Sequence, residues 1–184
     1  MTLAQLKTQV LSRLEPLTSA PTYNAIHNDQ YQRWADEKIP VVVTEFVKAG
    51  RIEAIQGLIV PDISVTITSG IGAFSFSDYF LPLSLTVTSA RVQVQLLTAP
   101  DEFYRWDSGS FVVTPRTARP VGIIMNSTVY VKPTNLATPA YLTYIKNHNP
   151  LFDAQETLFN DEGDAMLIEL VYQEASKALE IMEE

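Results

Sequence analysis

The spacing of apolar residues changes twice along this chain of 184 residues. Apolar residues recur every three or four positions up to about residue 50, alternate with polar residues from about residue 61, and return to the first spacing after about residue 152. The longer spacing is typical of amphipathic helices, and strict alternation is typical of strands with one buried face. We therefore expect helices at both ends of the chain and a β region between them.

Three helices are predicted, and each has one apolar face. Thr2 is placed to cap the first helix and Pro16 to end it, while acidic residues near the start of the third helix suit its dipole. The apolar faces comprise Leu3, Leu6, Val10, Leu11 and Leu14; then Tyr31, Trp34, Ile39, Val42, Val43, Phe46 and Val47; and finally Ala165, Leu167, Leu170, Val171, Ala175, Ala178, Leu179 and Met182.

The second helix contains a proline. Asn28 or Asp29 is expected to cap this helix, which continues to Gly50. Pro40 removes one backbone hydrogen bond and its ring crowds the preceding turn. We therefore expect the helix to kink or break near residues 38 and 39.

About six short strands are predicted between residues 58 and 150. Three alternating segments contribute Ile63, Val65 and Ile67; Leu83, Leu85 and Val87; and Val92, Val94 and Leu96. Two further strands near 121–125 and 128–132 are joined by a tight turn at Asn126 and Ser127, and a last strand lies in "AYLTYI". The segment "SGIGAF" is expected to be a glycine turn.

The predicted fold class is α+β, in which two N-terminal helices and one C-terminal helix form a bundle with an inserted antiparallel β-sandwich or small barrel. Three parts follow: an N-terminal helical part at 1–57, a β module at 58–150 and a C-terminal helix at 151–184. The terminal helix is expected to pack on the first two, because three apolar stripes each need a partner.

Composition narrows the function classes. A net charge of −8 argues against a nucleic-acid-binding protein, because binding phosphates requires clustered lysine and arginine. No cysteine is present, which excludes disulfides and thiolate chemistry. With 46% hydrophobic and only 18% charged residues, the surface is expected to include a large protein interface. No apolar run is long enough to predict a membrane span.

No motif predicts an enzyme, a metal site or a cofactor. The two histidines, His27 and His148, lie far apart in Asn-rich loops and are read as solvated loop or cap residues. The segment "NDEGD" lacks the ligand spacing of an EF-hand and is read as the acidic start of a helix. Phosphate-binding glycine loops and a nucleophile elbow are absent from the sequence.

Two segments place arginine beside aromatic residues, "YQRW" and "FYRWD". Such groups suit core-edge packing, a protein interface or stacking on nucleotides, and the sequence leaves these three interpretations open. A third segment, "TPRTARPVGIIMNSTVYVKP", is bracketed by prolines, which predicts either a stiff hairpin or a surface for a neighbouring subunit. The predicted subunit-interface residues are Arg33, Trp34, Tyr104, Arg105, Trp106, Arg116 and Arg119.

The order of these segments resembles the small neck proteins of tailed bacteriophages, the head-tail connector adaptors that dock beneath the portal. The resemblance rests on "YQRWADEKIPVVVTEFVKAGRIEAIQGLIV", then "GIGAFSFSDYFLPLSLTVTSARVQVQLLTAPDEFYRW", and then "PRTARPVGIIMNSTVYVKPTNLATPAYLTYIKNHNPLFD" before the acidic last helix. It covers most of the chain, and its motifs are structural. The β region is longer than in the smallest, all-helical adaptors.

The resemblance implies a structural virion protein without enzymatic activity, assembled in the host cytoplasm. Such proteins form a homo-oligomeric ring, commonly a dodecamer, with the portal protein and neighbouring tail proteins as partners, and DNA passes through the channel without specific binding. A second hypothesis is a β-sandwich module that binds carbohydrate or peptide, with the aromatic residues of "FYRWD" as its platform.

Overall fold

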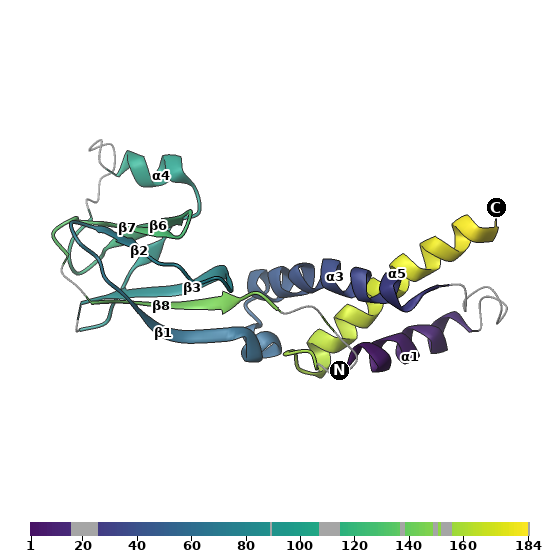
Figure 1. The fold of residues 1–184 in the computed structure, drawn as a ribbon. Coiled ribbons are helices and arrows are strands. Elements are labelled where there is room, and N and C mark those ends of the chain that lie inside the picture. Colours follow the sequence, from purple (N-terminus) through teal and green to yellow (C-terminus); the bar gives the residue numbers. More distant parts are fainter. Residues whose placement is uncertain are drawn as a thin grey trace. The chain divides into compact units, whose positions relative to one another are not determined.

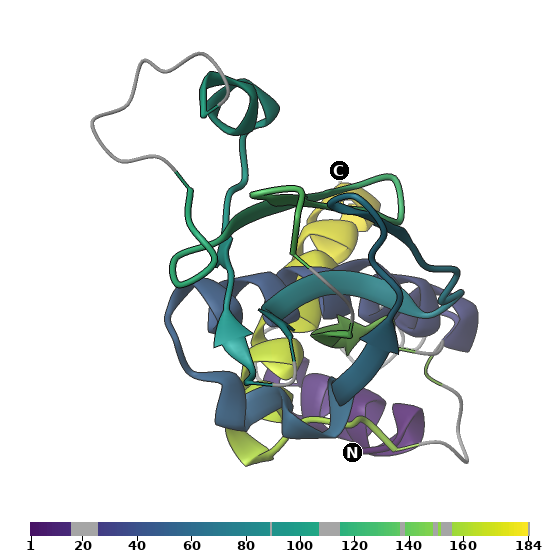
Figure 2. The same ribbon diagram turned by 90° about the vertical axis from the view of Figure 1, so that its left-hand side faces the viewer.

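A computed structural model describes residues 1–15, 26–88, 90–106, 115–136, 139–148, 151 and 156–183. The fold is α+β, as predicted, and its elements are labelled in Figure 1 and seen from a second direction in Figure 2. The chain divides into a helical unit, Met1–Leu58 with Asn147–Glu184, and a β unit, Ile59–Lys146.

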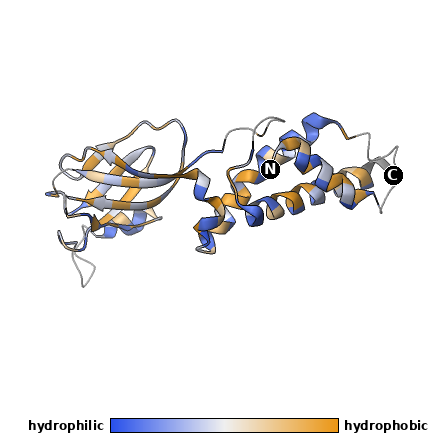
Figure 3. Ribbon diagram, turned by 90° about the horizontal axis from the view of Figure 1, so that it is seen from below, coloured by the Kyte–Doolittle hydropathy of each residue, from blue (hydrophilic) through white to orange (hydrophobic). Residues whose placement is uncertain are grey.

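The helical unit contains α1 (Leu3–Leu14), α3 (Asn28–Lys48), the 3₁₀ helix η1 (Ile52–Leu58) and α5 (Asp161–Glu183). α5 packs against both α1 and α3, so the predicted pairing of the terminal helix with the N-terminal helices is confirmed. Figure 3 shows hydrophobic and hydrophilic residues on the ribbon of each long helix, as expected of amphipathic helices.

Each helix buries one stripe, and the stripe on α5 repeats every fourth residue. The buried hydrophobic residues are Leu3, Leu6, Val10 and Leu14 on α1; Tyr31, Trp34, Ala35, Ile39, Val42, Val43 and Phe46 on α3; and Leu167, Val171, Ala175 and Leu179 on α5. Ala165, which was predicted on the apolar face of α5, is exposed. It lies two positions before Leu167, on a different side of the helix.

Of the two predicted N-caps, that of α1 is correct and that of α3 is wrong. Thr2 caps α1 through a reciprocal pair with Gln5, whose side chain accepts from the Thr2 backbone N–H at 2.8 Å. α3 is preceded by His27 rather than capped by Asn28 or Asp29, and the Gln30 side chain accepts from the His27 backbone N–H at 2.9 Å. Gln30, at the third position of the helix, therefore reaches back to the residue before the helix, as the N3 side chain of a capping box does.

A kink or a break was predicted near residues 38 and 39, and the break is wrong, because α3 continues as one helix from Asn28 to Lys48. Pro40 itself is exposed, while Ile39 and Val42 on either side of it are buried. The packing of these neighbours favours a continuous helix over the local preference of the proline. The Thr44 hydroxyl also donates to the Pro40 carbonyl at 2.7 Å.

Ion pairs connect the helices around this core. Lys38 of α3 lies 2.7 Å from Glu174 of α5, and both side chains are half-buried. The hydrogen bond from Lys38 is the main reason that the pKa of Glu174 is lowered from its ordinary value. Arg13 of α1 lies 2.8 Å from Glu169 of α5. These pairs link the surfaces beside the apolar stripes.

The β unit is a sandwich of two four-stranded sheets. One sheet has the order β1 (Ile59–Val65), β8 (Ala140–Lys146), β3 (Tyr79–Val87) and β4 (Val92–Gln93). The other has the order β2 (Ile71–Ala73), β7 (Thr128–Lys132), β6 (Val121–Met125) and β5 (Gln95–Leu96). The pairings between these strands are antiparallel except that of β5 with β6, which is parallel and was not predicted.

The predicted strand over residues 92–96 is instead two strands in different sheets. Val94 lies between them, and its backbone N–H donates to Leu85 of the first sheet at 2.8 Å. The next N–H, of Gln95, donates to Pro120 beside the second sheet at 2.9 Å. The period of 2 continues across this change of sheet because Val94 still points into the core, so the sequence pattern could not reveal it.

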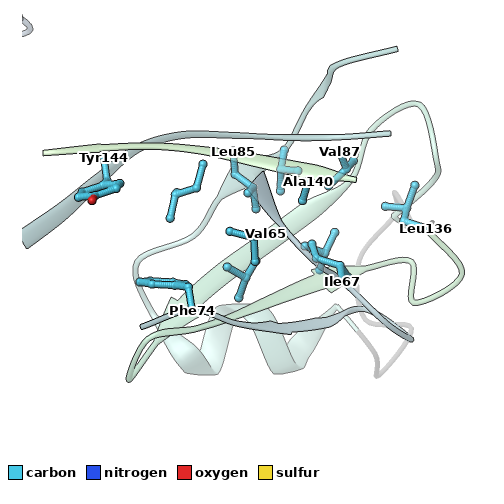
Figure 4. Packing of buried hydrophobic residues seen from close by; sticks show 12 residues of the cluster. Val65, Ile67, Phe74, Leu85, Val87, Leu136, Ala140 and Tyr144 are labelled. Carbon is cyan, nitrogen blue, oxygen red and sulfur yellow. The ribbon is translucent and has the colours of Figure 1, made fainter. Parts of the chain in front are cut away.

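Both sheets contribute to one core, shown in Figure 4. The buried members are Val65, Ile67, Phe74, Leu85, Val87, Val94, Val129, Val131, Leu136, Ala140, Leu142 and Tyr144. At one end, the rings of Phe76 and Tyr144 stack with their centroids 5.3 Å apart, and the Tyr144 hydroxyl donates to Asp78 at 2.9 Å. Burial, with a smaller contribution from Asp78, raises the pKa of Tyr144 to about 12.

Two turns connect strands of the second sheet to the chain before them. Asn126 and Ser127 have φ values of 48° and 59°, so the predicted tight turn between β6 and β7 is confirmed. The "SGIGAF" segment contains the expected turn but continues directly into β2, a strand that was not predicted. Gly70 has a φ of 78°, and a Cβ added there would lie 2.6 Å from the Val131 carbonyl oxygen, so this position requires glycine.

Two buried tyrosines should respond oppositely to removal of the hydroxyl. Among the described residues the Tyr31 hydroxyl has no hydrogen-bond partner, whereas the Tyr144 hydroxyl bonds to Asp78. We expect Tyr31→Phe to leave stability unchanged or raise it, and Tyr144→Phe to lower the free energy of unfolding by about 1 kcal/mol. Urea unfolding of both variants measures this difference, and an equal loss in both would contradict the assignment.

Alkaline pH should destabilise the fold. Burial raises the pKa of Tyr31, Tyr79 and Tyr144 to about 12, above the ordinary value of 10.0. A raised pKa in the folded state gives a contribution to stability that is complete below pH 10 and is lost as the pH rises through 12. We expect tyrosinate absorbance to appear over the same pH interval as unfolding, measured together by ultraviolet absorbance and circular dichroism.

Candidate functional site

The seven predicted interface residues lie on three elements. Arg33 and Trp34 belong to α3 in the helical unit. Tyr104 and Arg105 belong to a short helix of the β unit, α4 (Pro100–Arg105), which is followed by Trp106, and the other two lie in a turn before β6. Five of the seven therefore belong to the β unit.

The two candidates on α3 have different environments. Trp34 is buried, at 7% exposure, and its ring meets that of Tyr31 edge to face with centroids 5.6 Å apart. Trp34 therefore packs in the core, which was one of the three interpretations of its segment. Arg33 is on the surface, with 64% of its side chain exposed, and its Nε lies 3.9 Å from Glu37.

Local chemistry explains the formation of α4, which sequence reasoning missed. Pro100 occupies the start of the helix, where its missing N–H costs nothing. Asp101 and Glu102 follow in the first turn and Arg105 lies in the last turn, so the charges complement the helix dipole. The order Pro-Asp-Glu is a helix-start signal that could have identified this element.

Phe103 attaches α4 to the outer face of the second sheet. Its side chain is 4% exposed and packs against Leu97, Val121 and Ile123. Trp106, Met125 and Tyr130 are partly buried around this cluster. Figures 1 and 2 both show α4 at the periphery of the β unit. The sandwich therefore has a second, smaller hydrophobic cluster outside its main core.

Lys132 reinforces this attachment. Its side chain is buried at 7% exposure, and its ammonium donates to the Phe103 carbonyl at 3.0 Å. The same ammonium lies 4.2 Å from the centroid of the Phe103 ring. It therefore combines a charge-assisted hydrogen bond near the C-terminus of the helix with a cation–π contact. No sequence signal distinguished Lys132, because a lysine at the end of a strand is usually exposed.

The opposite face of α4 is open to solvent. Tyr104 is 58% exposed, and Arg105 is also exposed, while Trp106 is half-buried. Tyrosine and arginine are the residue types that carry much of the binding energy at protein interfaces. We call the exposed pair Tyr104 and Arg105, with Phe103 beneath it, the α4 surface.

The remaining two candidates form an arginine turn, residues 116–119. The Arg119 backbone N–H donates to the Arg116 carbonyl at 2.8 Å, and the reverse bond measures 3.4 Å. Both arginines are exposed, and neither guanidinium forms an ion pair with any residue that the structure describes. Pro120, which follows the turn, is buried and accepts a hydrogen bond from Gln95 at 2.9 Å. The turn between Pro115 and Pro120 thus presents two exposed cations that no described residue neutralises.

The other sequence candidates lie in structural roles. His148 accepts a hydrogen bond from the Leu158 backbone N–H at 3.3 Å, and His27 precedes α3. The "NDEGD" segment is the start of α5, where the Asn160 side chain accepts from the backbone N–H groups of Glu162 and Gly163, at 3.1 Å each. Within the described residues, no group of three or more His, Asp or Glu side chains is arranged to hold a metal ion.

Charge is divided unequally between the two units. Residues 59–146 contain 6 basic and 5 acidic residues, a net charge of +1. The rest of the chain contains 7 basic and 16 acidic residues, a net charge of −9. The acidity of the chain as a whole therefore comes from the helical unit, and the α4 surface and the arginine turn belong to the less acidic one.

No protein family matches this sequence, and no curated protein sequence is significantly similar to it. Over the described residues, no helix is both long enough and apolar enough to cross a bilayer.

Replacing Phe103 should detach α4. Phe103→Ala removes the side chain that joins α4 to Val121 and Ile123, a type of change that costs about 3–5 kcal/mol in a core. We expect trypsin to cleave after Arg105 at least about tenfold faster, because each 1.4 kcal/mol changes an opening equilibrium by a factor of ten. Limited proteolysis with mass spectrometry measures the rate. Tyr104→Ala, which removes an exposed ring, is the control, and equal rates in both variants would contradict the anchoring role.

Proposed function

We propose that this protein is a structural subunit, without enzymatic activity, of an oligomeric ring in the neck of a tailed-bacteriophage virion. The ring connects the portal protein to the tail around the DNA channel. The α4 surface is the observation that carries the proposal, because it presents exposed Tyr104 and Arg105 on a helix that Phe103 attaches to the sandwich. Ordered aromatic and arginine side chains suit a lasting protein contact.

Ring formation makes a specific demand on the subunit. A contact that repeats by rotation needs two different, complementary faces on each copy. The chain offers two units of different construction and charge, a helical unit with a net charge of −9 and a β unit with +1. The phage-neck resemblance adds the expected copy number, commonly twelve, and the expected location in the virion.

The net charge of the chain also has a consequence for how DNA passes through the channel of the proposed ring. A chain with a net charge of −8 does not neutralise phosphates over a broad surface. In the proposed ring, DNA passes without specific binding, and acidic residues that face the channel keep it from adhering. A ring reconstruction with a basic lumen would overturn this part of the proposal.

A β-sandwich module for carbohydrate or peptide is the second candidate, and exposed Tyr104 is the observation in its favour. Stacking on a sugar requires exposed ring faces. In "FYRW", however, Phe103 is buried and Trp106 is half-buried. Binding on a glycan array that is lost in Arg105→Ala with Trp106→Ala would favour this candidate over the ring.

Self-association tests the ring proposal. We expect the purified protein to form a closed oligomer alone or when mixed with its portal protein, seen by sedimentation velocity and by negative-stain micrographs. Tyr104→Ala with Arg105→Ala should weaken assembly by about 30-fold or more, because interface residues of these types contribute about 2 kcal/mol. Lys48→Ala, an exposed change on α3, is the control. A protein that stays monomeric under both conditions would contradict the proposal.

A further inference from the structure

The arginine turn carries two exposed positive charges, which suit a negatively charged partner surface. Arg116 and Arg119 are three positions apart in one turn, both are exposed, and neither is neutralised by a described residue of its own chain. Arginine forms bidentate hydrogen bonds with carboxylates, so a pair held this way fits a surface with several acidic side chains.

Most carboxylates of α5 are already neutralised. Glu169 pairs with Arg13, and Glu174 pairs with Lys38 and Lys177. Glu162 pairs with Arg51, and Asp164 lies 3.1 Å from the amino group of Met1. Exposed Asp161 and Glu180 form no ion pair with a described residue, but they lie near opposite ends of α5 and so do not form a cluster of available carboxylates.

α3 presents a different acidic surface. Asp29, Gln32, Arg33, Asp36 and Glu37 line one solvent-open hollow, and their spacing of three or four residues places them on one face of the helix. We call these five residues the α3 stripe. It holds three carboxylates and one guanidinium.

Two of these carboxylates are available to a partner. In the described part of the chain Asp29 forms no ion pair, and Glu37 reaches Arg33 only at 3.9 Å, with 59% of its side chain exposed. Asp36, by contrast, accepts a hydrogen bond from the Leu151 backbone N–H at 2.9 Å and so also has a role within its own chain. Asp29 and Glu37 are therefore the side chains to test.

We propose that the arginine turn of one copy binds the α3 stripe of a second copy of this chain, so that subunits join head to tail. The inference rests on the proposed ring and adds the two surfaces that meet. The turn belongs to the β unit and the stripe to the helical unit, so the contact is heterologous and can repeat from one subunit to the next.

Charge favours a second copy over nucleic acid as the occupant. The helical unit of a second copy carries a net charge of −9, which attracts the turn. DNA phosphates would instead meet two arginines on a chain whose total charge is −8, with exposed Asp101 and Glu102 on the same unit. Nucleic-acid binding usually relies on more phosphate contacts than two side chains provide.

Charge reversal tests the pairing in both directions. Arg116→Glu with Arg119→Glu should raise the concentration needed for assembly by about tenfold or more, and so should Asp29→Lys with Glu37→Lys. An equimolar mixture of the two variants should restore assembly, because every contact then joins opposite charges again. Raising NaCl from 0.1 M to 1 M should weaken wild-type assembly, since the screening length falls from about 10 Å to about 3 Å.

A matched control changes the same charge elsewhere. Lys48→Glu with Lys177→Glu alters exposed lysines on α3 and α5 by the same total charge as reversal of the arginines, and it should leave assembly within about twofold of wild type. Circular dichroism verifies that all variants fold. Sedimentation velocity supplies the assembly curves, and a gel-shift with duplex DNA is run alongside.

The outcomes separate this inference from the ring proposal. If wild type assembles and the reversed variants assemble equally well, or if mixing them restores nothing, the pairing is wrong and the ring proposal stands. If reversal of the arginines removes binding to DNA but leaves assembly intact, the turn contacts nucleic acid instead. If wild type is monomeric alone and with its portal protein, both ideas are overturned.

Discussion

Burial of the apolar stripe of α5 against α1 and α3 joins two stretches of chain that lie far apart in the sequence. Residues 59–146 separate them, so the helical unit closes only when the chain returns after the β unit. Neither α1 nor α3 can bury its stripe fully without α5, because a lone amphipathic helix gains little stability in water. This contact requires the β unit to be an insertion, with its entry at β1 and its exit at β8. These two strands are neighbours in one sheet, which brings the ends of the insertion together.

The insertion has its own core, and this independence lets it carry additional surface features. Residues from both sheets fill the sandwich, so the outer face of the second sheet is available for another element. α4 occupies that face through Phe103, and Lys132 fixes the end of the helix. Tyr104 is held at the surface as a result. An exposed aromatic residue on an anchored helix loses less conformational entropy on binding than one on a loop, which suits a contact surface.

The two units differ in charge as well as in construction. Glu169 and Glu174 of α5 are paired with cations beside the apolar core, whereas Asp29 of the α3 stripe and the two arginines of the arginine turn form no ion pair with a described residue. Grouping like charges on one unit greatly lowers the stability of a subunit only where the charges are buried. The charges of Asp29, Glu37, Arg116 and Arg119 are exposed. In a head-to-tail ring the same segregation makes each subunit complementary to the next. The phage-neck ring that we propose relies on one physical property, two unlike faces on one chain.

The sequence by itself determined the local structure wherever the apolar period was long and regular. It identified α1, α3 and α5, the turn at Asn126 and Ser127, and a β region that is either a sandwich or a small barrel, because these depend on residue period and backbone preference. Only the tertiary structure determined which side chains of each helix or strand are buried. Trp34 and Tyr104 sit in similar aromatic-arginine segments, yet Trp34 packs against Tyr31 in the core while Tyr104 is 58% exposed. The change of sheet at Val94, the continuous helix through Pro40 and the buried ammonium of Lys132 were decided by partners distant in sequence, which a local pattern does not encode.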